Sequence, residues 1–395
     1  MNFILFDDER FHSFLPLTHS RPIADIRCGI YTMREKWEHA VGMQLFTITQ
    51  DYLQEKFPLV LSEDNMCINA ALFPNKEVVE AMFNLKKGQC LIFENQLLAA
   101  RLTFSEAKEF NIEQIISNCN QVIFIATCKL LNNLWDIFSY NDIAIQDDFK
   151  KITNGRMSQK ISETNKIIGN NIFIEEGAKV ECAIINTETG PVYIGRNAEV
   201  MEGSIIRGPF AMGENAVLKM GAKIYGATTL GPGCKVGGEV NNSVFFANSS
   251  KAHDGFIGNA VIGEWCNLGA DTNNSNLKNN YEEVKLWNEQ KKTFVKTGLQ
   301  FCGLIMGDHS KCGINTMFNT GTVVGFSCNV YGAGFPRNFI PSFSWGSANG
   351  FMEYQLKKAI DTAVKVFDRR HIEFTAADYN LFERIYKNTS EQRNY

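Results

Sequence analysis

The sequence lacks several features that would assign a protein class at once. It has no basic tract, and its formal net charge is only −4 over 395 residues, so nucleic-acid binding is not implied. No apolar run is long enough to span a membrane. The opening MNFILFDDER runs from an apolar strand into acidic residues and does not follow the pattern of a signal peptide. We therefore expect a cytoplasmic protein with neither a membrane nor a nucleic-acid partner.

Cysteine pairs of the metal-binding kind are also missing. The eleven cysteines are odd in number, scattered, and form no CxxC pair. This distribution favours reduced thiols that serve as small apolar core residues over a disulfide or metal framework.

What the sequence does have is a long run in which every sixth residue is apolar. A period of six fits neither an amphipathic helix nor an alternating strand. It is typical of the hexapeptide β-helix, in which the chain coils as a triangular prism with one short strand per face. A set of ordinary strands with turn glycines is the alternative. The run consists of Ile194, Val200, Ile206, Met212, Leu218, Ile224, Leu230 and Val236.

The same spacing recurs on both sides of this run. It is interrupted by one long insertion, SNLKNNYEEVKLWNEQKKTFVKTG. Inserted loops in such solenoids often build the binding site. The further positions are Ile168, Ile174 and Val180 upstream, Phe256, Ile262 and Leu268 downstream, and then Met306, Cys312, Phe318, Val324 and Val330.

The remaining segments read as an α/β domain, a linker and a helical end. Residues 1–150 contain short apolar strands separated by helical stretches, which suggests a mainly parallel sheet. The polar stretch that begins at Asn141 reads as a connector, with the linker at 151–167. The β-helix then occupies 168–345. Residues 346–395 turn helical, and we expect them to cap the solenoid.

This plan, with two local motifs, resembles the bifunctional N-acetylglucosamine-1-phosphate uridyltransferase/glucosamine-1-phosphate acetyltransferase family. LPLTHSRPIADI is similar to the L-x-P-L-T-x-x-R-P-K stretch of its sugar nucleotidyltransferase domain. SSKAHDGFIGNAVIGEWCNLGADTNNSN and MGDHSKCGINTMFNTGTVVG resemble its acetyltransferase centre. The resemblance implies a shortened, Rossmann-like nucleotidyltransferase domain followed by a left-handed parallel β-helix with C-terminal helices.

The resemblance assigns an acetyl-transfer site to the β-helix. His253 matches the general base, which takes a proton from an attacking amine; histidine, with an ordinary pKa of about 6.5, suits this role. Asn267 falls where the family contacts the acceptor sugar. Ala270 and Asn276 fall where it meets acetyl-CoA.

Two further positions of this acceptor site depart from the family. Asn241 replaces a lysine that binds the sugar phosphate, and Phe256 replaces the usual tyrosine. Loss of the cation removes charge-assisted phosphate binding, so another amine or hydroxyl acceptor remains open.

The front domain would transfer a nucleotide from a nucleoside triphosphate to a sugar phosphate. The family uses a glycine-rich loop after the first strand, whereas this chain has FDDERFH. We expect Arg10, Thr18 and Arg21 to contact the nucleotide, and Asp7 and Asp8 to hold Mg²⁺. A solvated turn is the alternative for the acidic residues. Asn69 stands near the place of another metal ligand in the family.

Three functions follow from these observations. The first is a transferase of nucleotide-sugar biosynthesis that uses a sugar phosphate, a nucleoside triphosphate and acetyl-CoA. The second is a single-activity acyltransferase whose front domain only senses a nucleotide. The third is a non-catalytic trimeric regulatory or scaffold protein. In each case we expect a homotrimer, because the family assembles so and because flat prism faces favour self-packing.

Overall fold

The computed structural model describes all residues from Met1 to Tyr395 and divides into two compact units. The first contains Met1–Phe14, Ser20–Ile26 and Tyr31–Asn133, and the second contains Leu15–His19, Arg27–Ile30 and Leu134–Tyr395.

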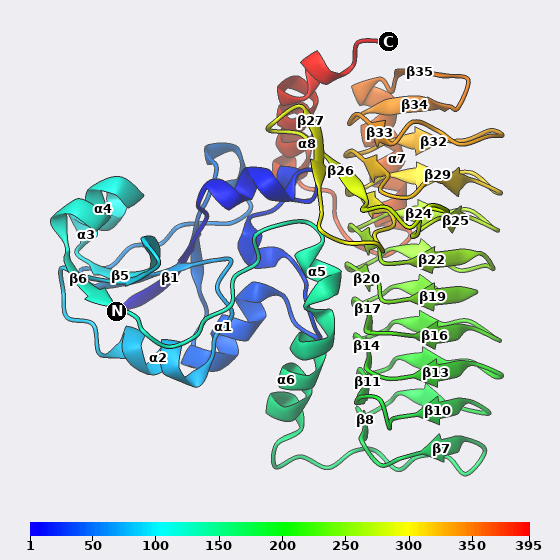
Figure 1. The fold of residues 1–395 in the computed structure, drawn as a ribbon, viewed down its shortest axis with the longest axis horizontal. Helices are drawn as coiled ribbons and strands as arrows, with labels where there is room; N and C mark the ends of the chain where they lie inside the picture. The colour runs from blue at the N-terminus through cyan, green and yellow to red at the C-terminus, as the bar shows by residue number, and fades with distance from the viewer. The chain divides into compact units, whose positions relative to one another are not determined.

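The first unit is built on a six-stranded mixed sheet with strand order β2-β1-β3-β5-β4-β6 (Figure 1). β1 pairs in parallel with β2 and β3, and β4 pairs in parallel with β6. β5 runs antiparallel to both of its neighbours, so the other five strands share one direction and the expected mainly parallel sheet is confirmed. The strands are β1 (Asn2–Phe6), β2 (Phe46–Ile48), β3 (Asn65–Asn69), β4 (Gln89–Phe93), β5 (Gln96–Leu102) and β6 (Asn120–Ile123).

Local caps fix the helices of this unit. α1 starts with a capping box between Thr32 and Glu35 and ends at Gly42, whose φ of 72° no other residue adopts as easily. The helices are α1 (Met33–Val41), α2 (Lys76–Phe83), α3 (Phe104–Lys108) and α4 (Ile112–Asn118), with 3₁₀ turns η1 (Glu9–Phe14), η3 (Ile23–Asp25) and η4 (Asp51–Leu53).

The second unit is a parallel β-solenoid with three faces (Figure 1). The first face contains β7 (Lys166–Ile168), β10 (Ile184–Asn186), β13 (Ile205–Arg207), β16 (Lys223–Tyr225), β19 (Glu239–Asn241) and β22 (Phe256–Gly258), with β25 (Asn273–Asn274) and β30 (Met317–Phe318) in the later coils. The second face contains β8 (Ile172–Ile174), β11 (Val192–Ile194), β14 (Phe210–Met212), β17 (Thr228–Leu230), β20 (Val244–Phe245), β23 (Val261–Ile262), β28 (Ile305–Met306), β31 (Val323–Val324) and β33 (Phe339–Ile340). The third face contains β9 (Lys179–Val180), β12 (Glu199–Val200), β15 (Val217–Leu218), β18 (Lys235–Val236), β21 (Ser250–Lys251), β24 (Asn267–Leu268), β29 (Lys311–Cys312), β32 (Asn329–Val330), β34 (Ser344–Ser347) and β35 (Gly350–Glu353).

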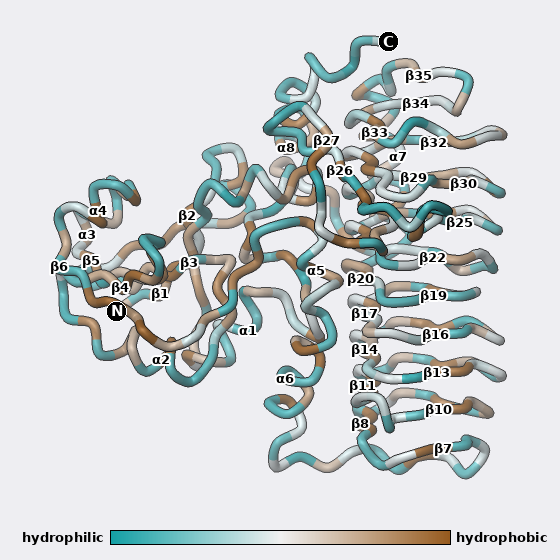
Figure 2. Tube along the Cα trace, in the orientation of Figure 1, coloured by the Kyte–Doolittle hydropathy of each residue, from teal (hydrophilic) through white to brown (hydrophobic).

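The predicted hexads form the core of this solenoid. All eight residues from Ile194 to Val236 are buried and belong to one continuous cluster. Figure 2 shows hydrophobic segments recurring in successive coils. The inward positions predicted from the sequence are wrong by one residue at two places. Ile167 rather than Ile168 packs against the core, and Ile257 rather than Phe256 is the buried residue. The fold class predicted from the sequence is otherwise confirmed.

A helix replaces the expected polar connector. The residues from Asn141 form α6 (Asn141–Thr153), which follows α5 (Asp136–Ser139) and buries one face. Asn141 donates to the carbonyl oxygen of Ala227, 2.8 Å away, and accepts a hydrogen bond from the hydroxyl of Thr229. The polar composition of this stretch concealed a helix that is anchored on the second face of the solenoid.

The long insertion and the C-terminal helices pack beside the later coils. The insertion contains an antiparallel hairpin of β26 (Lys285–Asn288) and β27 (Thr293–Lys296). α7 (Leu356–Asp368) and α8 (Ala376–Asn388) pack through aromatic rings; the Phe367 ring, for example, stacks on Trp265 at 4.2 Å between centroids. The 3₁₀ turns η2 (Leu17–His19) and η5 (Ser390–Gln392) complete this unit.

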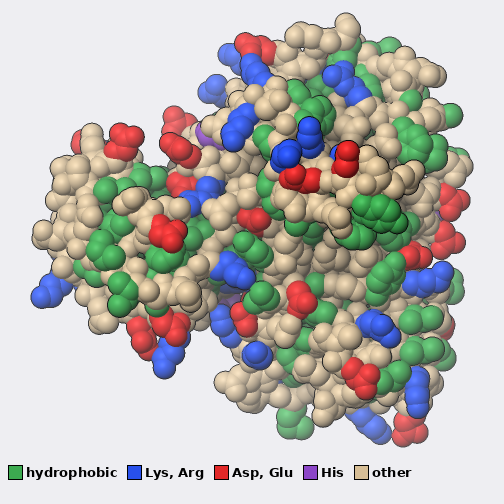
Figure 3. Space-filling view, in the orientation of Figure 1, with side chains coloured by type: hydrophobic (Ala, Val, Ile, Leu, Met, Phe, Trp, Pro, Cys, Tyr) green, Lys and Arg blue, Asp and Glu red, His purple; other side chains and the backbone are tan.

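The surface charges are mixed, and the cysteines are unpaired, as expected from the sequence. In Figure 3, acidic and basic side chains are interspersed on the face shown. All eleven cysteines are free thiols, and only that of Cys182 is classed as exposed. None of the helices is both long enough and apolar enough to cross a membrane.

Candidate functional site

His253 lies on a corner of the solenoid, between β21 on the third face and β22 on the first face. Its side chain is exposed. A general base needs access to its substrate, and this corner provides it.

Two other predicted residues lie close to this corner. The backbone N–H of Asp271 donates to the carbonyl oxygen of Asp254 at 3.1 Å, which stacks the corner containing Ala270 on the corner containing His253. Asn267 is exposed on the third face, where it pairs with Ser250 of the coil before. Ala270 and Asn267 therefore flank His253 on the neighbouring coil.

Asn241, Phe256 and Asn276 meet around a glycine on the first face. Asn241 pairs with Gly258, and a Cβ on Gly258 would lie 2.5 Å from Phe256 Cζ and 2.7 Å from Asn276 Nδ2. The amide of Asn276 also donates to Asn259 Oδ1 at 2.8 Å. Gly258, which sequence reasoning missed, thus leaves room for the Phe256 ring to lie along its own strand.

Sequence reasoning also missed Lys251, which precedes His253 by two residues. Lys251 is fully buried, and its ammonium group donates to the carbonyl oxygens of Gly237, His253 and Asp254 at 3.1, 2.6 and 2.9 Å. The available signal was a charged residue six positions after Phe245, where the hexad pattern expects an apolar one.

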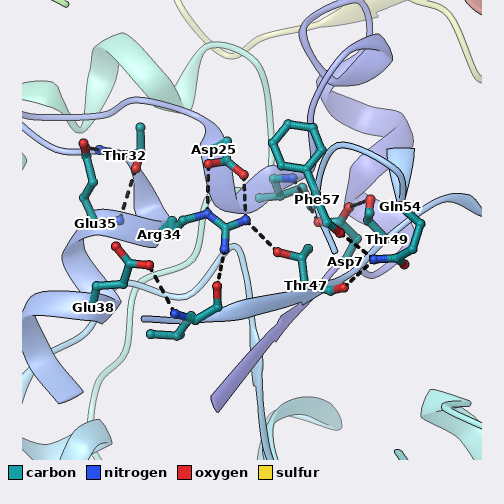
Figure 4. A network of polar contacts seen from close by, with 12 residues as sticks. Asp7, Asp25, Thr32, Arg34, Glu35, Glu38, Thr47, Thr49, Gln54 and Phe57 are labelled. Atoms are coloured by element: carbon teal, nitrogen blue, oxygen red, sulfur yellow. Dashed lines mark hydrogen bonds and ion pairs between the residues drawn. The ribbon is translucent and has the colours of Figure 1, made fainter. Parts of the chain in front are cut away.

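In the first unit, Asp7 follows β1 and accepts two hydrogen bonds. Its carboxylate accepts from the Ile23 N–H at 2.9 Å and from the Thr49 hydroxyl at 2.6 Å (Figure 4). Burial raises the pKa of Asp7 to about 7, and these two hydrogen bonds only partly oppose that effect. At neutral pH this carboxyl group therefore holds a proton for a large part of the time.

Asp8 is already paired with a cation. Its carboxylate forms an ion pair with the Arg10 guanidinium and accepts from Asn69 Nδ2 at 2.8 Å. Arg10 also donates to Asn132 Oδ1 at 2.8 Å and to Gln96. The structure thus brings Asp8, Arg10 and Asn69 together at the carboxyl ends of β1 and β3.

A second ion pair lies beside Asp7. Arg34 of α1 donates to both carboxylate oxygens of Asp25, at 2.9 and 2.8 Å, and to the Thr47 hydroxyl at 2.6 Å (Figure 4). Burial lowers the pKa of Arg34, but the Asp25 carboxylate outweighs this effect, so the net shift is upward. Asp25 and Arg34 were missed by sequence reasoning, although Asp25 lies within the LPLTHSRPIADI motif.

The other predicted nucleotide contacts are buried. Thr18 belongs to the second unit and Arg21 to the first. Next to Thr18, His19 Nε2 lies 3.1 Å from the Glu289 carboxylate of the insertion, in a buried pair.

The acidic residues of the first unit do not fit a resident metal ion as they are arranged. Asp8 is neutralised by Arg10, Asp7 accepts two hydrogen bonds, and no group of three His, Cys, Asp or Glu side chains lies close enough together to hold an ion. Mg²⁺ is a hard cation that prefers several oxygen ligands. The magnesium site therefore stays a prediction.

Known proteins are similar in sequence to the first unit and to most of the chain. Residues 3–157 match the family model described as sugar nucleotidyl transferase. The chain is 26% identical to the bifunctional protein GlmU of Methanococcus vannielii over 307 residues, which are 75% of this chain and 66% of that one. It is 31% identical over 144 residues, 36% of this chain and 35% of the relative, to the bifunctional sugar-1-phosphate nucleotidylyltransferase/acetyltransferase of Sulfurisphaera tokodaii.

Solved structures also resemble parts of the chain. The polySia-specific acetyltransferase NeuO matches 52% of this chain and 100% of its own, with 13% identity and a TM-score of 0.30. The N-acyltransferase AntD of Bacillus cereus matches 54% of this chain and 100% of its own, with 11% identity and a TM-score of 0.24. The aligned regions span 66% or less of the two curated relatives. By sequence similarity, residues 3–157 resemble sugar nucleotidyl transferases, and most of the chain resembles GlmU-like bifunctional proteins.

Proposed function

We propose that this chain is a sugar-1-phosphate nucleotidyltransferase/acetyltransferase of nucleotide-sugar biosynthesis, with its acetyl-transfer site around His253. The observation that carries this proposal is the exposed His253 corner on a parallel β-solenoid, flanked by Asn267 and Ala270 on the next coil. The sequence relationship to bifunctional relatives supports both activities.

The reaction at this corner is the transfer of an acetyl group from a thioester to an amine or hydroxyl. The neutral imidazole of His253 takes the proton of the acceptor as its nitrogen or oxygen attacks the thioester carbonyl. The C–S bond then breaks, and CoA leaves as a thiol after the proton is returned to its sulfur. Ala270 and Asn276 would contact acetyl-CoA, and Asn241, Phe256 and Asn267 would contact the acceptor.

The first unit would bind the nucleoside triphosphate and the sugar phosphate. The match to the sugar nucleotidyl transferase family over residues 3–157 supports this role. Arg10 and Arg21 of this unit would contact the phosphates. Binding of an anionic nucleotide would compete with Asp8 for the Arg10 guanidinium, since the two form an ion pair.

We also propose that the chain assembles as a homotrimer through the first face of the solenoid. Three outward side chains on neighbouring strands of that face, Ile184, Ile205 and Tyr225, have exposed fractions of 44%, 48% and 36%. These apolar side chains, which alternate with the exposed Arg207 and Lys223 on the same strands, offer a surface that can pack against a copy of itself. A mass in light scattering of three times the chain mass would agree with this assembly, and the mass of a single chain would contradict it.

A single-activity acyltransferase with a nucleotide-sensing front domain is the second candidate. The pairing of Asp8 with Arg10 favours it, because this ion pair reduces the negative charge available for a catalytic metal ion. Nucleotide binding without pyrophosphate release would support this candidate over the bifunctional one. A non-catalytic trimer is the third, and the accessible His253 corner argues against it.

The decisive experiment measures thiol released from acetyl-CoA over a panel of amino sugars and their 1-phosphates. We expect release that requires one acceptor and falls by at least about 10²-fold in His253→Ala, the usual size of a general-base contribution. His371→Ala is the matched control, because His371 is also exposed but lies after α7, outside the site. Equal rates for wild type and His253→Ala would overturn the assignment.

A further inference from the structure

Lys251 occupies a position in the solenoid where the fold places apolar residues. Its strand register pairs it with Val236 of the coil before. The pairing of Ser250 with Asn267 sets it beside Leu268 of the coil after. Both neighbours are core residues, and Lys251 itself has no exposed area. A buried ammonium group is costly unless hydrogen bonds compensate it, so this lysine requires an explanation other than packing.

The ammonium group of Lys251 joins two successive corners. It donates to Gly237 O in the preceding corner at 3.1 Å, and to His253 O and Asp254 O in its own corner at 2.6 and 2.9 Å. Three acceptors match the three protons of the charged form. Burial lowers the pKa of Lys251 to about 8, and the carboxylates of Asp254 and Asp271 partly oppose this shift.

The need for such a link follows from the lengths of the two corners. Buried residues on either side of this edge are usually six positions apart, as Leu218 and Ile224 are, but Val236 and Val240 are only four apart. The next corner, from Lys251 to Ile257, returns to six. The corner that contains His253 is thus stacked on a shorter one, and the Lys251 side chain bonds to carbonyls of both.

We propose that Lys251 is a positioning residue that fixes the backbone at His253, and therefore the place of its imidazole, from inside the solenoid. This inference rests on the proposed acetyl transfer at His253. A catalytic base must be held within a fraction of an ångström of its productive position, and a displacement of about 1 Å can cost about 10²-fold in rate. A methionine in place of Lys251 would fill similar volume but remove the ammonium donor from all three carbonyls, and only that of Asp254 would keep another donor, the Asp271 N–H.

The test compares Lys251→Met with a core variant that lowers stability elsewhere. Leu218→Ala suits this purpose, since Leu218 lies in the same inward column two coils earlier and is fully buried. Below the melting temperature of both variants, we expect kcat for acetyl transfer to fall about 10- to 100-fold in Lys251→Met, with the KM for acetyl-CoA changed less than about threefold. Leu218→Ala should keep kcat within about twofold. An unchanged kcat in folded Lys251→Met, or an equal loss in both variants, would overturn the inference.

A second measurement does not depend on activity. Hydrogen exchange followed by mass spectrometry should show faster exchange of the amides from Ala252 to Phe256 in Lys251→Met, with other corners unchanged. Lys251→Arg, which keeps a cationic donor, should recover part of both the protection and kcat. Equal amide protection and equal kcat in Lys251→Arg and Lys251→Met would count against a positioning role of Lys251.

If the substitutions prevent folding, the wild-type chain still provides a test. Raising the pH from 7 to 9.5 removes one donor from Lys251, and the His253 corner should then lose more protection than the corner at Glu202 and Gly203, after correction for the intrinsic rate of exchange. Equal losses at the two corners would overturn the inference. Failure of the proposed function would give a different result. Wild type and His253→Ala would then transfer acetyl groups at the same rate, whether or not Lys251 changes the exchange protection of the His253 corner.

Discussion

The Phe256 ring lies over Gly258, two residues further along the same strand. A Cβ on Gly258 would come within 2.5 Å of Phe256 Cζ, a distance that real side chains do not reach. The same Cβ would lie 2.7 Å from Asn276 Nδ2. Gly258 therefore sets the orientation of an aromatic ring and an amide that we place in the acetyl-transfer site.

Gly258→Ala should disturb this part of the site more than the fold. The added methyl group must displace the Phe256 ring, so we expect the KM for the acceptor to rise about tenfold and the free energy of unfolding to fall by about 1–3 kcal/mol, the usual cost of overpacking. Steady-state kinetics and urea unfolding would measure the two effects.

Gly313→Ala is the control for Gly258→Ala. Its new Cβ would meet its nearest neighbour at 3.4 Å, an ordinary contact distance. We expect neither KM nor stability to change appreciably. An acceptor KM that is unaffected by Gly258→Ala would show that the Phe256 ring does not contact the acceptor.

The raised pKa of Asp7 predicts that the stability of the folded chain depends on pH. Its pKa is about 7 in the folded chain against an ordinary 3.8, so the folded state binds more protons between these two values. Stability from this group is therefore full below about pH 4 and is lost as the pH rises through 7. Asp7→Asn, which resembles the protonated acid, should be more stable than wild type at pH 8 by about 1–2 kcal/mol, a discounted share of the about 1.4 kcal/mol per pKa unit.

The measurement for Asp7 is urea unfolding of both proteins at several pH values. At pH 4 the advantage of Asp7→Asn should be much smaller, because the wild-type carboxyl group is then protonated in the folded chain and about half protonated in the unfolded chain. Glu9→Gln, an exposed neighbour in the same loop, should show no such trend. An equal stability difference at pH 4 and pH 8 would contradict the prediction.

The exposure of the cysteines predicts their reactivity. Only the thiol of Cys182 is classed as exposed, whereas burial raises the pKa of Cys234 and Cys328 to about 12. The thiolate is the reactive form, so a thiol reagent should label Cys182 first in the native protein. Cys182→Ser should remove this fast phase and leave the slower labelling intact. Fast labelling that persists in Cys182→Ser would contradict the lower accessibility of the other thiols, of which Cys119 and Cys128 are partly exposed and the rest are buried.

The apolar pattern predicted the solenoid because each face of each coil must place an apolar side chain in the core. It failed where the step between buried residues changes: Ile257 and Ile262 are only five apart, so a period of six counted back from Ile262 placed Phe256 where Ile257 is buried. β5 was missed for a similar reason. Its turn uses Glu94 and Asn95 at positive φ, without the glycine that usually marks a hairpin.

The candidate site was less predictable than the fold. His253 is proposed only through its resemblance to a family motif, because a lone histidine carries no signal of its own. Lys251 could have been recognised as a charge at an inward position, but its three carbonyl partners depend on how two corners stack. The pairs Asp8–Arg10 and Asp25–Arg34 depend on side-chain placement, which the order of residues does not specify.

One corner column shows how the solenoid holds its C-terminal helices. The earlier coils place asparagine there with positive φ, as at Asn197 and Asn215, whereas a later coil places Trp265 there with φ 60°. A bulky residue in this conformation is strained by about 1–2 kcal/mol. The compensation is the stacking of Trp265 on Phe367 of α7 at 4.2 Å.

Trp265→Asn tests this balance. The substitution relieves the backbone strain but removes most of the ring contact with α7, so we expect a net loss of about 2–3 kcal/mol, less than the about 3–5 kcal/mol usual for deleting a buried tryptophan. Hydrogen exchange should quicken in α7 and leave the early coils unchanged. Asn215→Ala, at the equivalent corner of an earlier coil, should cost only about 1 kcal/mol and leave α7 protected. A Trp265→Asn variant as stable as wild type would mean that α7 is held by its other contacts and that the strained tryptophan is not needed for docking it.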